Sequence, residues 1–291
     1  MLPFFGIFFI IYNMEYQITV VFILGVYFFV IGAIFGSFLN MLVYRVYKGE
    51  NLFGRSYCDF TGKHLKIIDL IPIVSYFLFK GKCRDCHKKI PLLYPLMEFL
   101  MGVISLMVFF KVSSYINILN INLPQILINW FLIFIICFIF IFFAYYDYLH
   151  WEIDSKAVYI ALVVLVILNM INFFIPLPFL GPSVENFIAG GILAGIIFLI
   201  FQLSNGGGMG EGDIYLFAFI GLSLGLVGGL LALAVTSISG SIVGVAKAVI
   251  TKKKIKGLKI QLAPFIAFGF LVIFFYKDFI LSLLRLNFLI F

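Results

Sequence analysis

Two aspartates stand at the ends of long apolar segments, where a carboxylate is costly to maintain and is usually functional. Asp147 follows residues 125–146, which contain no charged side chain, and Asp213 closes the phrase GMGEGD at residues 208–213. Two carboxylates that share one proton can activate a water molecule and assist the departure of an amine, which is what peptide hydrolysis requires. The pair predicts a membrane-embedded aspartyl protease that needs no cofactor for this reaction.

Glycines crowd the segment around Asp213 and disfavour a continuous helix there. Irregular backbone at membrane depth is tolerated where it lines a cavity, and an extended substrate could pair with it by strand-like hydrogen bonds. We therefore expect Gly210 and Gly212 to form active-site backbone. The simpler alternatives are that the aspartates cap helices and that the glycines form a turn. The glycines are Gly206, Gly207, Gly208, Gly210 and Gly212, and the nearby acids expected to be solvated caps are Glu152, Asp154 and Glu211.

The composition predicts an all-α membrane protein. Of the 291 residues, 64% are hydrophobic and 11% are charged, and the mean hydropathy is +1.19. A soluble domain of this length does not need so much apolar surface. We expect a polytopic bundle of about eight transmembrane helices. The expected spans lie near residues 19–43, 92–110, 125–146, 156–176, 186–203, 214–227, 230–250 and 263–284.

The net charge of +7 is concentrated in loops between the apolar runs. Residues 44–90 carry ten Lys or Arg against four acids, and residues 251–261 carry five Lys and no acid. Such loops mark the cytoplasmic side of a membrane and meet anionic lipid headgroups, so the charge does not indicate nucleic-acid binding. The six expected spans between the loops put both on one side, together with Asp147 and Asp213. The sequence thus predicts a cytoplasmic (inner) membrane protein whose active site faces the cytoplasm.

The polar stretch near residues 112–124 divides the chain into two regions. Residues 1–111 hold two spans and the basic loop 44–91, and residues 112–291 hold six spans and both aspartates. The loop carries Cys58, Cys83 and Cys86, for which a reducing cytoplasm favours metal binding over a disulfide. Cys137 stands alone in an apolar run and is expected to pack in the core.

Ordered phrases along the chain resemble those of type IV prepilin peptidases, the bifunctional leader peptidases and N-methyltransferases of bacterial pilus, secretion and competence systems. The resemblance runs from about Gly36 to Gly269. It rests on GSFLNMLVYR at residues 36–45, the cysteine pattern that includes Cys58, Cys83 and Cys86, the segment from Ile90 through Tyr94-Pro95 to Glu98, Asp147, GMGEGD, and APFIAFG at residues 263–269.

The resemblance implies two activities. Such enzymes remove a basic leader from prepilin or pseudopilin substrates at the cytoplasmic face, and then methylate the new amino terminus with S-adenosylmethionine. Residues 1–111 would be the N-methyltransferase region and residues 112–291 the peptidase domain. Asn40, Arg45 and Glu98 are the expected methyl-transfer site. The alternatives are an interhelical hydrogen bond for Asn40, a cytoplasmic-side anchor for Arg45, and a buried partner of that arginine for Glu98.

One departure from the family pattern concerns metal binding. The pattern has two CxxC pairs, and Thr61 stands where the second cysteine is expected. Three cysteines could still hold a structural zinc ion with a histidine as the fourth ligand. We expect His64 rather than His87, because His87 directly follows Cys86 and would be harder to orient. A metal-free loop held by packing is the alternative.

Two other functions stay open at this point. The incomplete cysteine pattern is compatible with a family member that cleaves leaders without methylating them. A proton- or cation-coupled transporter or channel would also carry acids within the membrane. Transporters often have related halves and broken helices near the midplane, whereas no repeat is visible here and both acids lie toward one face.

Overall fold

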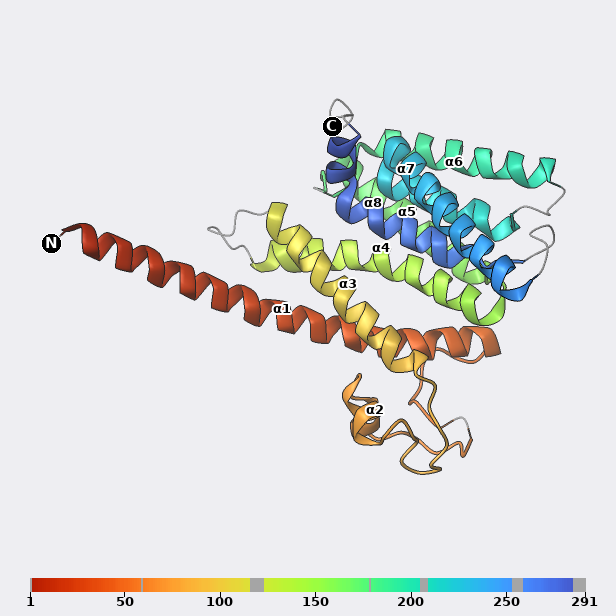
Figure 1. The fold of residues 1–291 in the computed structure, drawn as a ribbon, viewed down its shortest axis with the longest axis horizontal. Coiled ribbons are helices and arrows are strands. Elements are labelled where there is room, and N and C mark those ends of the chain that lie inside the picture. The colour runs from red at the N-terminus through yellow and green to blue at the C-terminus, as the bar shows by residue number, and fades with distance from the viewer. Residues whose placement is uncertain are drawn as a thin grey trace. The chain divides into compact units, whose positions relative to one another are not determined.

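The chain is helical, as its apolar runs predict. The computed structural model describes residues 2–58, 60–115, 123–177, 179–204, 209–252 and 259–284, and in these the β pairing consists of two isolated bridges. The α-helices are α1 (Leu2–Lys48), α2 (Val74–Leu78), α3 (Leu93–Tyr115), α4 (Leu123–His150), α5 (Ser155–Phe174), α6 (Ser183–Leu203), α7 (Glu211–Thr251) and α8 (Ala263–Leu283), and one 3-10 helix is η1 (Ile67–Leu70) (Figure 1).

Seven helices in the described parts of the chain are long and apolar enough to cross a membrane. Six expected spans correspond to α1, α3, α4, α5, α6 and α8. The other two, near 214–227 and 230–250, together form the 41-residue α7. A straight helix of this length would measure about 60 Å, roughly twice the apolar thickness of a bilayer.

Helix α7 is interrupted at Gly225, whose φ of 68° and ψ of −172° are not helical. The interruption therefore does not lie at Gly228 and Gly229, the two residues between the expected spans 214–227 and 230–250. Gly229 is helical, and its missing side chain leaves room for Leu193 of α6. Gly225 is the position that needs glycine for its backbone, because its positive φ is unfavourable for other residues.

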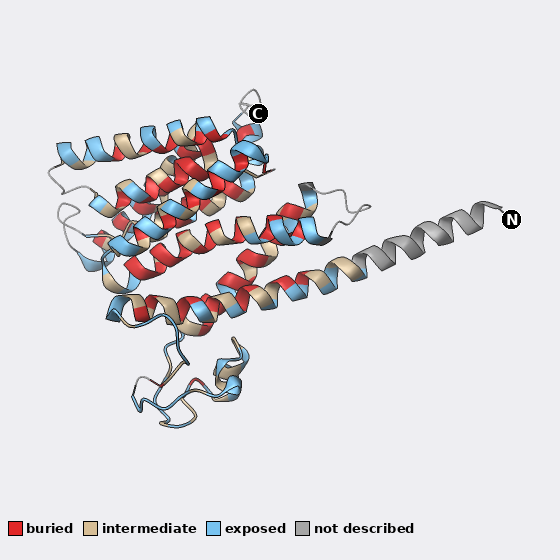
Figure 2. Cartoon of the chain, turned by 180° about the vertical axis from the view of Figure 1, so that it is seen from behind, coloured by how far each residue is buried: buried red, intermediate tan, exposed pale blue. Residues whose placement is uncertain are grey.

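The helices form two compact units, Met1–Phe134 and Ile135–Phe291, whose border falls within α4. The first unit contains α1, α3, the beginning of α4, and the loop between α1 and α3, which includes η1 and α2. The second contains the end of α4 and helices α5–α8. In both units the buried residues gather on the helix faces that meet other helices (Figure 2). The functional division expected at residues 111 and 112 stays a prediction.

Helices α1 and α3 of the first unit approach closely where glycine faces backbone. A Cβ atom on Gly36 would lie 2.5 Å from the Cα of Glu98, and one on Gly32 would lie 2.9 Å from the Cα of Gly102. Small residues allow this kind of packing in membranes, where helix association depends on close contact rather than on hydrophobicity. The phrases GSFLN and YPLME therefore form the two sides of one helix contact.

Aromatic rings and a buried polar chain complete this unit. Ser105 donates a 2.5 Å hydrogen bond to the Phe28 carbonyl, and the Trp130 indole donates to the Ser105 carbonyl at 3.1 Å. The Phe28 ring stacks on Phe109 with centroids 4.7 Å apart, and Trp130 stacks on Phe134 at 4.9 Å. These contacts join α1, α3 and α4.

Close glycine contacts also join the helices of the second unit. A Cβ atom on Gly221 of α7 would lie 2.5 Å from the Cα of Gly190 on α6. One on Gly269 of α8 would lie 2.5 Å from Oγ1 of Thr236 on α7. Helix α7 is thus packed against α6 on one side and α8 on another, which fixes the helix that carries Asp213.

Buried asparagines stabilise the interruption of α7. Asn169 of α5 donates to the carbonyl of Leu222, just before Gly225, at 3.0 Å. Asn186 of α6 donates to Oδ1 of Asn169 at 2.9 Å. Both asparagines are fully buried. Since no water is available in an apolar surrounding, these side chains supply partners that a continuous helix would not require.

We expect Gly221→Ala to destabilise the protein by about 1–3 kcal/mol, the usual cost of overpacking. The new methyl group would meet the backbone of Gly190, so α6 and α7 would have to separate. Thermal unfolding in detergent, followed by circular dichroism, measures the effect. Gly191→Ala on α6 is the matched control, because nothing lies within 4 Å of its added Cβ. Equal stability of the two variants would contradict this account of the contact.

Candidate active site

Asp147 lies in the last turn of α4 and is 9% exposed. Its Oδ2 accepts a 3.2 Å hydrogen bond from the backbone N–H of Ala263, the first residue of α8. The Gln261 side chain donates to the carbonyl oxygens of Asp147 and Tyr148. The segment leading into α8 therefore holds both the carboxylate and the helix end that carries it.

Asp213 is the third residue of α7 and is 7% exposed. Its Oδ2 accepts a 2.9 Å hydrogen bond from the backbone N–H of Gly210, the N-cap of the helix. A carboxylate in the first turn also interacts favourably with the helix dipole. The structure does not describe Gly206, Gly207 and Gly208, so the irregular backbone expected there stays a prediction.

The two carboxyl groups come from different helices of the second unit and are close enough to interact electrostatically. Each is buried, and each is held through Oδ2 by one backbone N–H. Two like charges brought together in an apolar surrounding favour a state in which the pair holds one proton. The structure thus brings together the two acids that the sequence singled out, in an arrangement suited to acid–base chemistry.

Gly212 has a different backbone conformation from the expected one. It is the second residue of α7 and is helical, so the expectation of irregular backbone at this position was wrong. A Cβ atom here would lie 2.5 Å from Cδ1 and 3.0 Å from Cγ1 of Ile153. Glycine therefore lets the first turn of α7 pack against the connection between α4 and α5, which keeps Asp213 close to the end of α4.

The remaining acids near the pair do not join it. Asp154 is the N-cap of α5, and its Oδ1 accepts a 2.8 Å hydrogen bond from the backbone N–H of Ala157, which confirms the expected cap. Glu152 is exposed in the turn after α4, and Glu211 is exposed at the start of α7.

Three thiols meet in the loop of the first unit. The Sγ atoms of Cys58, Cys83 and Cys86 all lie within 4.8 Å of one another, and those of Cys86 and Cys83 lie 3.6 and 3.7 Å from that of Cys58. Metal–sulfur bonds of about 2.3 Å in a tetrahedral site place the sulfurs about 3.8 Å apart. The spacing fits a bound metal ion. Cys137 is fully buried in α4, as expected.

The thiols are carried by two turns of similar geometry. The N–H of Cys58 donates to the Lys63 carbonyl at 2.9 Å, and the N–H of Cys83 donates to the Lys88 carbonyl at 2.8 Å. The antiparallel bridges Tyr57–His64 and Lys82–Lys89 flank the turns, and the residues with left-handed backbone at their ends are Gly62 and His87. Thr61 thus occupies in the first turn the place that Cys86 occupies in the second.

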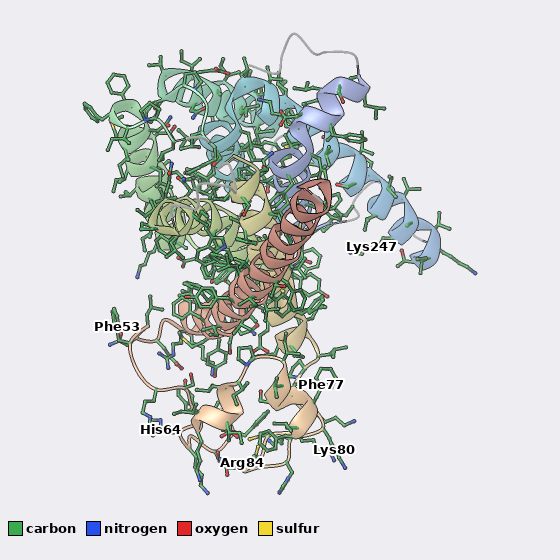
Figure 3. The ribbon with its side chains drawn as sticks, turned by 90° about the vertical axis from the view of Figure 1, so that its left-hand side faces the viewer. Phe53, His64, Phe77, Lys80, Arg84 and Lys247 are labelled. Carbon is green, nitrogen blue, oxygen red and sulfur yellow. The ribbon has the colours of Figure 1, made fainter. Side chains whose placement is uncertain are left out.

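The structure does not bring His64 to the thiols. His64 is exposed on the loop (Figure 3). Its backbone pairs with Tyr57 on the flank of the turn. Among the described residues, the group of possible metal ligands contains the three cysteines and neither His64 nor His87. Thr61 lies closer, because its side chain hydrogen-bonds to Cys58 and is the main cause that lowers the pKa of this thiol to about 7.

The residues expected for methyl transfer line one cavity of the first unit. Asn40 and Glu98 are buried. Asn40 of α1 donates a 3.2 Å hydrogen bond to the carbonyl of Tyr94 on α3. This confirms the interhelical hydrogen bond that was the alternative role for Asn40. Oε2 of Glu98 accepts a 2.6 Å hydrogen bond from the N–H of Ile73, and the carboxylate also bonds to Ser37.

Arg45 holds the chain that leaves α1. It is 4% exposed, and its guanidinium donates to backbone carbonyls rather than to Glu98. Four such bonds use its donors, so the structure does not support Arg45 as a partner for a charged cosubstrate. The carbonyls belong to Asn51, Leu52, Gly54 and Arg55, at 3.3, 2.9, 3.4 and 3.1 Å.

The sequence reasoning missed Gln261 and Asp69. Gln261 stands just before the phrase APFIAFG, and its position after the basic loop was the available signal. Asp69 is the one acid in residues 60–84. Its Oδ2 accepts from the Lys66 N–H and pairs with Arg84 at 3.1 Å; Figure 3 shows Arg84 on this loop.

Comparison with known proteins finds relatives that align with most of the chain. The family model described as "Bacterial Peptidase A24 N-terminal domain" matches residues 30–112. Prepilin leader peptidase/N-methyltransferases of Bacillus subtilis (strain 168) and Neisseria gonorrhoeae are each 29% identical, over 87% and 86% of this chain and 95% and 89% of theirs. The chain is thus similar to prepilin leader peptidase/N-methyltransferases over most of its length. The Vibrio cholerae member is 27% identical over 68% of this chain and 77% of its own length.

No solved structure matches the chain significantly. Residues 30–112, which match the family model, contain the contact between α1 and α3 and the cysteine turns, while both aspartates lie beyond them. The full-length relatives extend over the second unit as well.

We expect Gly212→Val to lower cleavage of a leader-bearing prepilin by about a hundredfold, although it removes no reacting group. The added side chain would collide with Ile153 and displace the first turn of α7, and small displacements of catalytic groups are costly. Initial cleavage rates of purified protein test this. Ile153→Ala in the same chain should restore part of the rate, and Gly191→Val is the control at an uncrowded glycine. A wild-type rate for Gly212→Val would show that the contact is dispensable.

Proposed function

We propose that the chain is a membrane-embedded aspartyl endopeptidase that removes the leader of prepilin-like proteins. The observation that carries this proposal is the pair of buried carboxyl groups, Asp147 and Asp213, presented by different helices and close enough to interact. The function named for the relatives that align with most of this chain supports the choice of substrate class. It also favours a peptidase over the transporter that the membrane acids alone would allow.

The pair can carry out hydrolysis without a cofactor. One carboxylate takes a proton from water as the water oxygen attacks the scissile carbonyl carbon, and the other carboxyl group donates a hydrogen bond to the carbonyl oxygen. The proton then passes to the departing amine as the C–N bond breaks. Each aspartate accepts a backbone hydrogen bond through Oδ2, and we infer that Oδ1 is the oxygen that takes part in the reaction.

The substrate would be a prepilin or pseudopilin whose apolar helix lies in the same membrane. Basic loops such as residues 44–90 favour the cytoplasmic side, so we infer cleavage at the cytoplasmic face of the inner membrane. The leader carries positive charge and would stay on that side. Backbone donors and acceptors near Gly210 are suited to bind an extended peptide.

We infer that the first unit carries the second activity, N-methylation. S-adenosylmethionine would supply the methyl group: the amine nitrogen bonds to the methyl carbon, the C–S bond electrons stay on sulfur, and the amine proton passes to water. Support comes from the names of the relatives and from the polar residues Asn40 and Glu98 that line one cavity. A peptidase without methylation is the alternative.

We infer further that the cysteine turns hold a structural zinc ion. The three thiols have suitable spacing, and Thr61 or a water molecule would take the fourth position. The ion would join the two turns, and the helices η1 and α2 that lie between them in the chain contain no buried residue.

We expect Asp147→Asn and Asp213→Asn each to reduce leader cleavage by more than about a hundredfold. Asparagine keeps the shape of the side chain but can neither act as a base nor share a proton. Cleavage of a purified prepilin, measured at equal enzyme concentration, is the test. Asp154→Asn is the matched control, because this helix cap lies outside the pair. Near-normal cleavage by either purified variant of the pair would overturn the proposed dyad.

Metal analysis of the purified chain should find about one zinc ion per molecule if the thiols form one site. Cys83→Ser should lower the zinc content, whereas Thr61→Cys should make zinc harder to remove with a chelator, because a fourth thiolate replaces a weaker ligand. Cys137→Ala, which removes a thiol far from the loop in sequence, should leave the content unchanged. A zinc-free wild-type protein with the same unfolding temperature after zinc addition would favour a loop held by packing.

A further inference from the structure

The loop between α1 and α3 exposes a run of apolar side chains over residues 67–78, which we call segment 67–78. It covers η1 and α2, and neither helix contains a buried residue. Single exposed apolar residues are ordinary on a protein surface, whereas a continuous group of them marks an interaction site. Seven large apolar side chains of the segment are exposed, namely Ile67, Ile68, Leu70, Ile71, Val74, Phe77 and Leu78.

The short helix α2 is turned with its polar side toward the protein. Ser75 and Tyr76 line the cavity of the first unit, whereas Val74, Phe77 and Leu78 are exposed. Positions i, i+3 and i+4 share one face of a helix, so these three side chains form a single apolar face. A helix at the surface of a soluble domain has the opposite arrangement. The outer face of α2 therefore fits an apolar surrounding.

The start of α2 lies beside a helix that can span the membrane. The N–H of Ile73 donates a 2.6 Å hydrogen bond to Oε2 of Glu98 in the second turn of α3, and α3 is long and apolar enough to cross a bilayer. The turns of α3 up to Glu98 cover about 9 Å along the helix axis. Interfacial helices insert their apolar faces to a similar depth, about 5–10 Å.

The surface of α3 at this level is itself apolar and exposed. Leu96 and Phe99, on either side of Glu98, are 54% and 51% exposed, as is typical of side chains that contact lipid. Figure 1 shows the loop beside α1, with α2 further back along α1 than the rest of the loop. Segment 67–78 thus continues the lipid-facing surface of the membrane helices.

Lysines stand at both ends of segment 67–78. Lys66 precedes it, Lys80 and Lys82 follow it, and all three are exposed. Asp69, the one acid between Lys66 and Lys82 in the sequence, is paired with Arg84. Long basic side chains reach from an apolar surface to the headgroup region, where anionic lipids attract them. The charges that flank the segment therefore complement an anionic membrane surface.

We propose that segment 67–78 docks in the leaflet at which α1 ends and α3 begins. Its exposed apolar side chains lie among the upper parts of the acyl chains, and Lys66, Lys80 and Lys82 meet the phosphates of anionic lipids. This leaflet is the cytoplasmic one in the orientation predicted from the basic loops. The docking adds to the two activities proposed above and depends on neither. It gives the cysteine loop a second attachment, to lipid as well as to α1 and α3.

Photocrosslinking identifies what covers the segment. Full-length protein with p-benzoylphenylalanine in place of Phe77 is reconstituted, without prepilin, into vesicles of phosphatidylglycerol and phosphatidylethanolamine that contain a radiolabelled phospholipid. The replacement keeps an aromatic side chain at a position that is 70% exposed, so the fold is retained. The same amino acid in place of Asp85 is the matched control, because Asp85 is exposed in the second cysteine turn, outside the segment.

We expect at least about tenfold more lipid label per protein from the Phe77 position than from the Asp85 position, because removal of one large apolar side chain from water favours the docked state by about this factor or more. Vesicles of phosphatidylcholine alone should give less label from the Phe77 position, because they lack the charge that complements the lysines.

Trypsin accessibility tests the docking without a crosslinker. In nanodiscs of the same anionic composition, where both membrane faces are open to the protease, Phe77→Asp should raise the rate of cleavage after Lys80 and Lys82 about tenfold, because a carboxylate opposes insertion. His64→Asp adds the same charge at an exposed position of the loop outside the segment and should leave the rate unchanged. An unfolding temperature equal to that of the wild type shows that Phe77→Asp keeps its fold.

Equal lipid labelling from the Phe77 and Asp85 positions would overturn the proposal, and so would equal trypsin rates for the wild type, Phe77→Asp and His64→Asp. A crosslink from the Phe77 position to a second copy of the chain in place of lipid would assign the surface to self-association. Transfer of the crosslink from lipid to prepilin, when prepilin is added, would assign it to the substrate. Equal labelling in anionic and phosphatidylcholine vesicles would overturn the part given to the lysines.

Discussion

The second unit is organised by the need to keep two carboxyl groups in apolar surroundings. Such groups require donors, and backbone N–H groups at the starts of helices are available for this purpose because they have no partner within the helix. Gly210 supplies one to Asp213, and Ala263 supplies the other to Asp147. The starts of α7 and α8 must therefore meet the end of α4, and the order of the helices in this unit follows from that requirement.

Glycine contacts make these positions attainable. The pairs Gly190–Gly221 and Gly269–Thr236 place α7 close to α6 and to α8 at the level of the backbone. Gly212 does the same for the first turn of α7 against Ile153. In a bilayer, where apolar side chains gain little by leaving lipid, such close packing is a main source of helix association. These glycines position the helices that carry the two aspartates, and among the described glycines of this unit Gly225 is the one with a positive φ.

The sequence predicted those features that depend on charge and length. Asp147 and Asp213 stood out because charges are rare in apolar runs, and the spans followed from the length needed to cross a membrane. Features that depend on three-dimensional contact were harder to predict. The sequence does not distinguish the glycines near residue 225 from one another. Only the backbone conformation shows that Gly225 interrupts α7, whereas the neighbouring glycines lie at contacts between helices. The family phrases located Asn40 and Glu98. That the guanidinium of Arg45 donates to backbone carbonyls became evident only from the structure. His64 had the right chemistry for a metal ligand, whereas the turn geometry puts Thr61 nearer to the thiols.

Glu98 connects the pair of membrane helices α1 and α3 to the cysteine loop. Its main chain packs against Gly36 inside the pair of membrane helices, and its side chain holds the N–H of Ile73, a residue whose φ of 63° is unfavourable for a β-branched side chain. Arg45 makes a similar connection from α1. Since η1 and α2 contain no buried residue, the loop has little core of its own. It is therefore an extension of the helix pair rather than an autonomous domain, and cutting it free of α1 and α3 would remove the framework that gives it shape.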